Sequence, residues 1–92
     1  MKNVLRLPKW IHVLLEIYKS QNKPSYCQRL NRRLKASLSH IREIIKQLVT
    51  YKLVEIRPKH RIKRLVLTDR GKRIAASLQE ISYELNNSNN NE

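Results

Sequence analysis

The segment from Leu30 to Glu55, LNRRLKASLSHIREIIKQLVTYKLVE, constrains the fold more than any other part of this 92-residue chain. Leu30 and Leu34 place an apolar stripe on one short helix, and Ser37 suits the N-cap of the next. From Ser37 to about Lys52, apolar residues recur at the helical period, at Ile41, Ile44, Ile45 and Leu48. The segment therefore predicts two helices around a tight turn, with the second helix running directly into a strand.

The second of these helices also has a polar face, opposite its apolar stripe. Its members are Ser39, Arg42, Glu43, Lys46 and Thr50. These side chains suit base edges and phosphates in a major groove. Arg42 is the side chain best suited to a guanine and Lys46 to a phosphate. Ser37, Ser39 and His40 are further candidate DNA contacts near the helix start, with Ser39 and His40 suited to bases or phosphates. Glu43 suits a cytosine amine or holds Arg42 in place, although an ordinary surface pair of Arg42 and Glu43 is the alternative.

The flanking sequence predicts one further helix before this segment and a hairpin after it. Pro8 suits the first turn of a helix whose apolar residues from Trp10 to Tyr18 cover much of its circumference, which places that helix in the centre of the core. Pro24 opens the helix that ends at about Leu34. A strand is expected from Leu53 to Arg57, stopped by Pro58, with the returning strand from Ile62 to Thr68.

The predicted hairpin is strongly basic. Its cations are Arg57, Lys59, His60, Arg61, Lys63 and Arg64, counting histidine as a potential one. No acid lies between Arg57 and Arg64, so we expect the hairpin to reach a minor groove or the flanking backbone of a nucleic acid. The alternative is a charged hairpin that only contacts solvent.

The last predicted helix runs from about Arg70 to Leu85 and is capped by Thr68 or Asp69, with Gly71 costing little so near its start. Its apolar residues recur at steps of four, three and four, at Ile74, Leu78, Ile81 and Leu85. Such a stripe either pairs with its copy in a second subunit, which we favour, or folds back on the core. Residues 86–92, NNSNNNE, are expected to be a disordered polar tail.

This series of motifs resembles the winged helix-turn-helix of the MarR-type (multiple-antibiotic-resistance regulator) family. The matching residues are Leu30, Leu34, Ala36, Ser37, Ile41, Leu53, Val54 and the run Leu67-Thr68-Asp69-Arg70-Gly71. Lys35 and Lys52 stand where the family usually has glycine, which implies left-handed turns at a cost of about 1 kcal/mol each. The small size is similar to that of stand-alone winged helices from archaea and their viruses.

The resemblance implies an α+β, mostly helical fold with a three-helix core, a two-stranded β-hairpin wing and a C-terminal helix. Residues 1–85 would form one winged helix-turn-helix domain, with dimerisation through the helix at about 70–85. Many MarR-like regulators bind small effectors, but this chain has no obvious additional pocket-forming segment, so no effector is assumed.

The charge distribution indicates a polyanionic partner. The chain has 20 Lys plus Arg against 7 Asp plus Glu, a net charge of +13. All 20 bases and four of the acids lie between Lys2 and Arg73, so this part has a charge of +16, and the three remaining acids give −3 from Ile74 onward. We therefore expect the nucleic-acid surface to exclude the last helix.

Other functional classes find little support in the sequence. The single cysteine, Cys27, excludes an internal disulfide and is interpreted as a small buried hydrophobe, with a redox sensor as the alternative. No metal site, cofactor motif or catalytic set is discernible, so an enzyme is not expected. With neither a signal peptide nor a membrane segment, a soluble cytoplasmic protein is expected.

We thus predict a sequence-specific regulator that binds double-stranded DNA as a homodimer on an inverted repeat. Phosphate contacts are expected from Arg29, Arg32, Arg33 and Lys35 together with the hairpin bases. The main alternative is a winged helix that binds RNA or acts as a non-specific architectural protein, and a module for an acidic protein partner is a third possibility.

Overall fold

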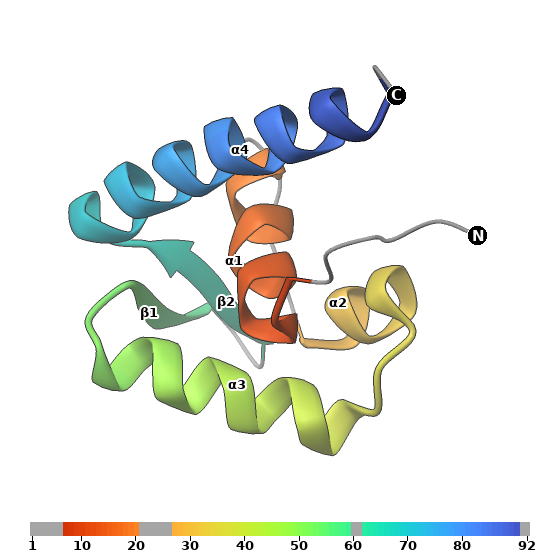
Figure 1. The fold of residues 1–92 in the computed structure, drawn as a ribbon. Coiled ribbons are helices and arrows are strands. Elements are labelled where there is room, and N and C mark those ends of the chain that lie inside the picture. Colours follow the sequence, from red (N-terminus) through yellow and green to blue (C-terminus); the bar gives the residue numbers. More distant parts are fainter. Residues whose placement is uncertain (1–6, 21–26, 60–61, 91–92) are drawn as a thin grey trace.

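The computed structural model describes residues 7–20, 27–59 and 62–90, which form four helices and a two-stranded antiparallel sheet. The elements in chain order are α1 (Lys9–Lys19), α2 (Cys27–Leu34), α3 (Leu38–Thr50), β1 (Val54–Lys59), β2 (Ile62–Leu67) and α4 (Asp69–Asn90). In Figure 1, α1 lies in the centre, with α4 on one side, α2 and α3 on the other, and the hairpin beside them. This arrangement confirms the predicted α+β, mostly helical fold class.

Helix α1 occupies the core because apolar residues cover most of its surface. Val13 and Leu14 are fully buried, and α1 contacts α2, α3, β2 and α4. The same helix buries one acid, Glu16, whose residue is only 8% exposed. Its carboxylate is paired with a guanidinium of α2, as described below. The central position predicted for this helix is confirmed.

The turn between α2 and α3 is closed by side chains on both sides. The Ser37 hydroxyl accepts a hydrogen bond of 3.1 Å from the backbone N–H of His40, so Ser37 is the N-cap of α3 as predicted. The Asn31 side-chain amide donates to the Ala36 carbonyl. Lys35 has a φ of 53°, which confirms the left-handed turn at that position. Residues 21–26, including Pro24, lie outside the described part of the chain.

Successive side chains of the hairpin point alternately to an inner and an outer face. Its register pairs Val54 with Leu67 and Ile56 with Leu65, and these four side chains share the face directed at the core. Lys52, with a φ of 63°, forms the left-handed turn that leads into β1. The prediction that Pro58 stops β1 is wrong, because the strand continues to Lys59. A sheet of two strands leaves each strand one open edge, where proline is tolerated.

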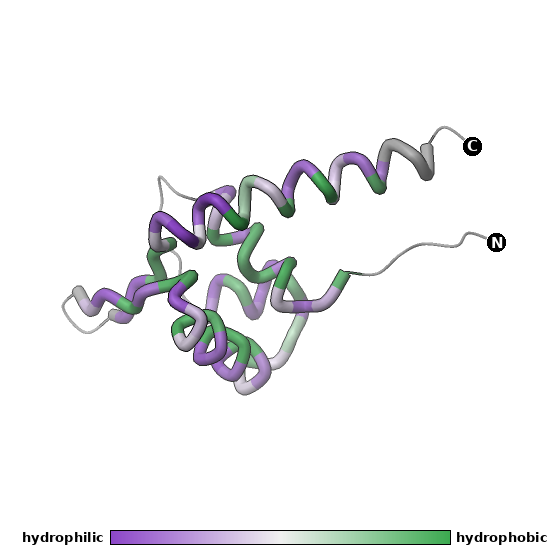
Figure 2. The backbone as a smooth tube through the Cα atoms, turned by 60° about the vertical axis from the view of Figure 1, so that its left-hand side comes forward, coloured by the Kyte–Doolittle hydropathy of each residue, from purple (hydrophilic) through white to green (hydrophobic). Residues whose placement is uncertain are grey.

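Helix α4 is longer than predicted, since it continues to Asn90 rather than ending near Leu85. The helix thus includes residues 86–90, which the sequence analysis assigned to a polar tail, and residues 91–92 lie outside the described part. Neither proline nor glycine interrupts the sequence after Gly71, so nothing local ends the helix. Figure 2 shows the C-terminal part of α4 extending away from the rest of the molecule.

Gly71 lies where α4 crosses the start of the hairpin. A Cβ atom at this residue would lie 2.0 Å from the Leu53 carbonyl oxygen, so only glycine fits. The Thr68 hydroxyl accepts a 2.9 Å hydrogen bond from the Gly71 N–H and donates one of 2.6 Å to the Lys52 carbonyl. The sequence analysis considered only the helix-propensity cost of Gly71, whereas a long-range contact determines the residue here.

Candidate nucleic-acid interface

The outer face of α3 is the first component of the site. Ile41, Ile44, Ile45 and Leu48 are buried against the core, which turns the opposite side of the helix to solvent. The exposed residues on α3 include every polar side chain expected there: Ser39, His40, Arg42, Glu43, Lys46 and Thr50. Ser37 is also exposed, as the N-cap. The predicted division of this helix into a buried and a polar face is confirmed.

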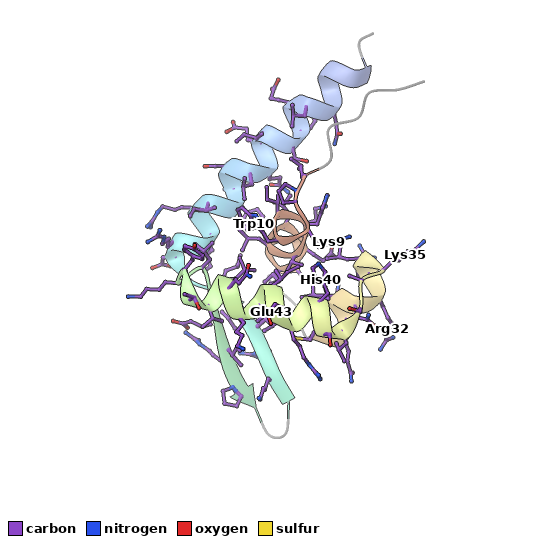
Figure 3. The ribbon with its side chains drawn as sticks, turned by 60° about the horizontal axis from the view of Figure 1, so that its bottom comes forward. Lys9, Trp10, Arg32, Lys35, His40 and Glu43 are labelled. Atoms are coloured by element: carbon purple, nitrogen blue, oxygen red, sulfur yellow. The ribbon has the colours of Figure 1, made fainter. Side chains whose placement is uncertain are left out.

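The polar residues of α3 differ in position around the helix. Ser39, Arg42, Glu43 and Lys46 border the hairpin, whereas His40 falls on the flank away from it by helical spacing. Figure 3 shows His40 and Glu43 along α3, with Arg32 and Lys35 at the α2 end of the molecule. The Thr50 hydroxyl donates to the Lys46 carbonyl at 3.0 Å, so its proton is already used within the helix.

A hollow of about 380 Å³ lies between α3 and the hairpin. We call it the inner hollow. It is lined by Cys27 of α2, Ser39, Arg42, Glu43, Ile45 and Lys46 of α3, and Ile56, Lys63 and Leu65 of the hairpin. The hollow thus brings together cations that the sequence analysis assigned to two separate sets, the second helix of the motif and the wing.

Cys27 forms part of the floor of the inner hollow and is half-buried. Burial raises the pKa of its thiol, and the positive charges of Arg42 and Lys63 act in the opposite direction. The raised pKa keeps the thiol protonated at neutral pH, which fits a packing residue better than a reactive thiolate. Because the positive charges of Arg42 and Lys63 both act on the Cys27 thiol, these two side chains lie near the same residue.

The hairpin bases are divided between its two faces by strand alternation. Lys63 shares the inner face with Ile56 and Leu65, whereas Arg57 and Arg64 pair across the outer face. The Arg57 guanidinium donates to the Glu55 carboxylate at 3.0 Å. Arg64 is half-buried. The Lys59 side chain and residues His60 and Arg61 lie outside what the structure describes.

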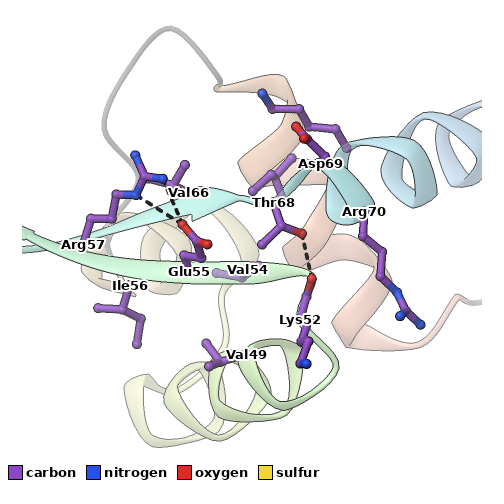
Figure 4. Close-up of a pocket in the computed structure, with 12 residues that line it drawn as sticks. Val49, Lys52, Val54, Glu55, Ile56, Arg57, Val66, Thr68, Asp69 and Arg70 are labelled. Carbon is purple, nitrogen blue, oxygen red and sulfur yellow. Dashed lines mark hydrogen bonds and ion pairs between the residues drawn. The ribbon is translucent and has the colours of Figure 1, made fainter.

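A second, wider hollow of about 890 Å³ adjoins the outer edge of the hairpin, and we call it the outer hollow (Figure 4). Its cations are Lys52, Arg57, Arg70 and Lys72, and its acids are Glu55 and Asp69. Ile56 lines both hollows, and Val49 lines the outer hollow alone. Figure 4 also shows the Glu55–Arg57 pair and the hydrogen bond from Thr68 to Lys52.

The four basic residues expected to contact phosphates differ in whether they also have partners within the chain. The Arg33 Nε donates to the buried Glu16 carboxylate at 3.0 Å, although 61% of the Arg33 side chain stays exposed. Arg29 is half-buried and donates to the Ser20 hydroxyl at 3.3 Å. Arg32 and Lys35 are exposed. Two of the four side chains therefore also join helices within the chain.

These internal partners were missed at the level of sequence. Glu16 interrupts an apolar run, which was the available signal that a buried acid needed a cation. Asn31, which closes the turn before α3, gave no comparable signal. Both residues hold the helices of the interface in place through contacts within the chain, and neither belongs to its exposed surface.

The apolar stripe of α4 is divided between two environments. Ile74 and Leu78 are half-buried and pack against the core cluster, so the first half of the stripe folds back on the domain. Ile81 is 52% exposed and Leu85 is half-buried. The alternative in which the stripe folds back on the core thus holds for its first half, and in the second half Ile81 is exposed.

None of the described helices is long and apolar enough to span a membrane. No group of three or more His, Cys, Asp or Glu side chains gathers to form a metal site in the described ranges.

The comparisons with known proteins rest on structure. The sequence matches no protein-family model and no curated protein. The solved structure of AF1382 from Archaeoglobus fulgidus is 29% identical and superposes with a TM-score of 0.77, covering 84% of this chain and 87% of that one. F-93 of SSV1 is 24% identical at a TM-score of 0.68, covering 90% of this chain and 94% of that one.

Larger proteins share the same fold. The adhesin competence repressor AdcR from Streptococcus pyogenes is 20% identical at a TM-score of 0.81, and MepR from Staphylococcus aureus, a transcription regulator of the multidrug efflux pump MepA, is 18% identical at 0.79. The matches cover 92% and 87% of this chain but only 63% and 60% of those proteins. These likenesses confirm the predicted fold.

Proposed function

We propose that this chain, whose fold is the winged helix-turn-helix, is a transcription regulator that binds double-stranded DNA. The observation that carries the proposal is the inner hollow, where Arg42 and Lys46 of α3 and Lys63 of the hairpin converge on a solvent-facing side of a +13 chain. AdcR and MepR, named a repressor and a transcription regulator, support it by analogy of fold.

In the proposed binding mode α3 enters the major groove of the duplex. Arg42 contacts a guanine, because a guanidinium can donate two hydrogen bonds to its O6 and N7 atoms. Glu43 accepts from a cytosine amine or orients Arg42. Lys46, Arg32 and Lys35 contact phosphates, and these three side chains are exposed and positioned around the helix start or its outer face.

The wing is proposed to contact the adjacent minor groove or the flanking backbone. Lys63 is exposed beside α3, and Lys59, His60 and Arg61 follow as predicted contacts near the hairpin tip. Arg57 and Arg64 lie on the outer face of the hairpin, away from α3. We therefore assign them a smaller share of the binding than the sequence analysis did.

Two copies are proposed to associate through the projecting half of α4, with Ile81 and Leu85 at the contact. The exposure of Ile81 and the projection of this segment from the domain support the assignment. A two-fold axis between the copies would relate two α3 helices, so the target would be an inverted repeat with half-sites about one helical turn apart.

Selection of bound duplexes from a random pool tests the proposal directly. We expect an enriched inverted repeat containing a guanine that depends on Arg42. Arg42→Ala should lose about 1–3 kcal/mol on the selected duplex and relax the preference at one base pair, whereas Lys46→Ala should weaken all duplexes alike. Gln79→Ala on α4 is the control and should bind like the wild type.

Other outcomes would contradict the proposal. An unenriched pool, with structured RNA competing as well as duplex DNA, would favour an RNA-binding or architectural role. Equal losses for Arg42→Ala on selected and random duplexes would reassign Arg42 to a phosphate.

A further inference from the structure

Ile56 is a large apolar residue on the inner face of the hairpin that is 43% exposed. Its neighbours on the same face, Val54 and Leu65, are 1% and 5% exposed. The inner face of the hairpin thus extends beyond the edge of the core. The first side chain beyond that edge is apolar, and it forms one wall of the inner hollow.

The inner hollow combines an apolar floor with a cationic rim. Ile45, Leu65 and Cys27 are buried or half-buried on the floor, and the raised pKa of the Cys27 thiol keeps the floor uncharged. Arg42, Lys46 and Lys63 supply three positive charges against the single acid Glu43. Such a lining suits a ligand with one anionic part and one apolar part.

If the proposed function holds, one strand of the duplex has both an anionic and an apolar part and has to pass through the inner hollow. When α3 occupies the major groove and the wing contacts the adjacent minor groove, the sugar–phosphate strand that separates the two grooves runs between them. Its phosphates are anionic, and the C2′ methylene of its deoxyribose is apolar. The hollow between α3 and the hairpin is the space available to that strand.

We infer that the inner hollow binds one deoxynucleotide unit of this strand, with its phosphate between Lys46 and Lys63 and its sugar against Ile56. The inference rests on the proposed function and adds a selectivity to it. A ribose in the same place would direct a 2′-hydroxyl at the Ile56 side chain, which is aliphatic and cannot accept a hydrogen bond. Ile56 therefore makes the site selective for DNA over RNA.

The size of the effect follows from the cost of an unsatisfied polar group. Removing a hydroxyl from water without a new hydrogen bond weakens binding by about five- to 150-fold. The lining side chains that do have acceptor oxygens, Ser39 and Glu43, belong to α3. We therefore expect the penalty at a single nucleotide of each half-site, and not along the whole strand.

The test is a walk of single ribonucleotides along the selected duplex, with binding measured for the wild-type protein. We expect a loss of about five- to 150-fold at one nucleotide per half-site and less than twofold elsewhere. A 2′-fluoro nucleotide at the sensitive position controls for sugar conformation, because it favours the ribose-like pucker without the hydroxyl. It should bind nearly as well as the deoxynucleotide.

Two matched variants connect the effect to Ile56. Ile56→Thr keeps a β-branched side chain in the strand and adds a hydroxyl partner, so the penalty should shrink to about twofold or less. Val49→Thr makes a comparable exchange on an exposed residue that lines only the outer hollow, and it should keep the full penalty. Thermal unfolding of both variants checks that the fold is retained.

The outcomes separate the inference from the proposed function. Sequence-specific duplex binding that tolerates a ribonucleotide at every position, or an Ile56→Thr variant with an undiminished penalty, overturns the inference alone. A 2′-fluoro nucleotide that is as harmful as the ribonucleotide also overturns it, because sugar shape would then be the cause. Failure of the wild type to prefer any duplex overturns the proposed function and the inference together.

Discussion

At the scale of single residues, Gly71 is the position where backbone packing leaves no space for a side chain. Gly71→Ala should destabilise the fold by about 3 kcal/mol, because a Cβ atom 2.0 Å from the Leu53 carbonyl oxygen forces α4 away from the hairpin. Urea unfolding measures the loss. Ala76→Gly, at an exposed position of the same helix, is the control and should cost about 1 kcal/mol. A Gly71→Ala variant more stable than the wild type would contradict the contact.

Lys35 and Lys52 provide a second test among single residues, since both have a positive φ. Replacement of either by glycine removes the left-handed strain but adds disorder to the unfolded chain, so a net gain of about 0.5 kcal/mol is expected for each. Only Lys35→Gly should weaken DNA binding, because Lys35 is a proposed phosphate contact and Lys52 lines the outer hollow. Equal effects of the two variants on DNA affinity would contradict this assignment.

At the scale of elements, the helices and strands followed from local patterns with few exceptions. The apolar period of α3, the cap at Ser37 and the alternation of the hairpin were all legible in consecutive residues. The ends of elements were less so. Pro58 is accommodated because β1 has an open edge, and α4 continues to Asn90 because no local residue ends it.

Helix α4 carries the proposed contact between two copies. Ile81→Glu should disrupt the proposed dimer, because it places a charge in an apolar contact, and sedimentation should show a shift from dimer to monomer. Gln79→Glu, which adds the same charge at an exposed position off the Ile74 to Leu85 stripe, should leave the dimer intact. A wild-type protein that sediments as a monomer would contradict the assignment of this half-helix.

At the scale of the whole molecule, the net charge of +13 should make DNA affinity depend steeply on salt. With ~5 phosphate contacts per subunit, log affinity should fall with log salt at a slope of about −9 for the dimer. Arg32→Ala should reduce the magnitude of that slope by about 2, one contact from each subunit. Lys72→Ala, in the outer hollow, should leave it unchanged. A flat salt dependence would remove the electrostatic basis of the proposal.

The candidate site was predictable in composition but not in arrangement. The exposed face of α3 was expected from its period, and Arg42 and Lys46 lie on it. The split of the wing bases was not anticipated, since Lys63 faces α3 while Arg57 pairs with Glu55 on the other face. Strand alternation contains this information, but using it requires knowing which face of the hairpin is buried.

The helices, the strands and the sign of the surface charge could be predicted from the amino-acid sequence, because they depend on neighbouring residues or on simple composition. Which basic side chains pair with groups inside the molecule became apparent from the packing of the helices and the hairpin. Arg33 meets Glu16 from another helix, and Gly71 meets the Leu53 carbonyl across the start of the hairpin. Such contacts join residues distant in the chain, and their partners are selected by packing, which no local pattern records.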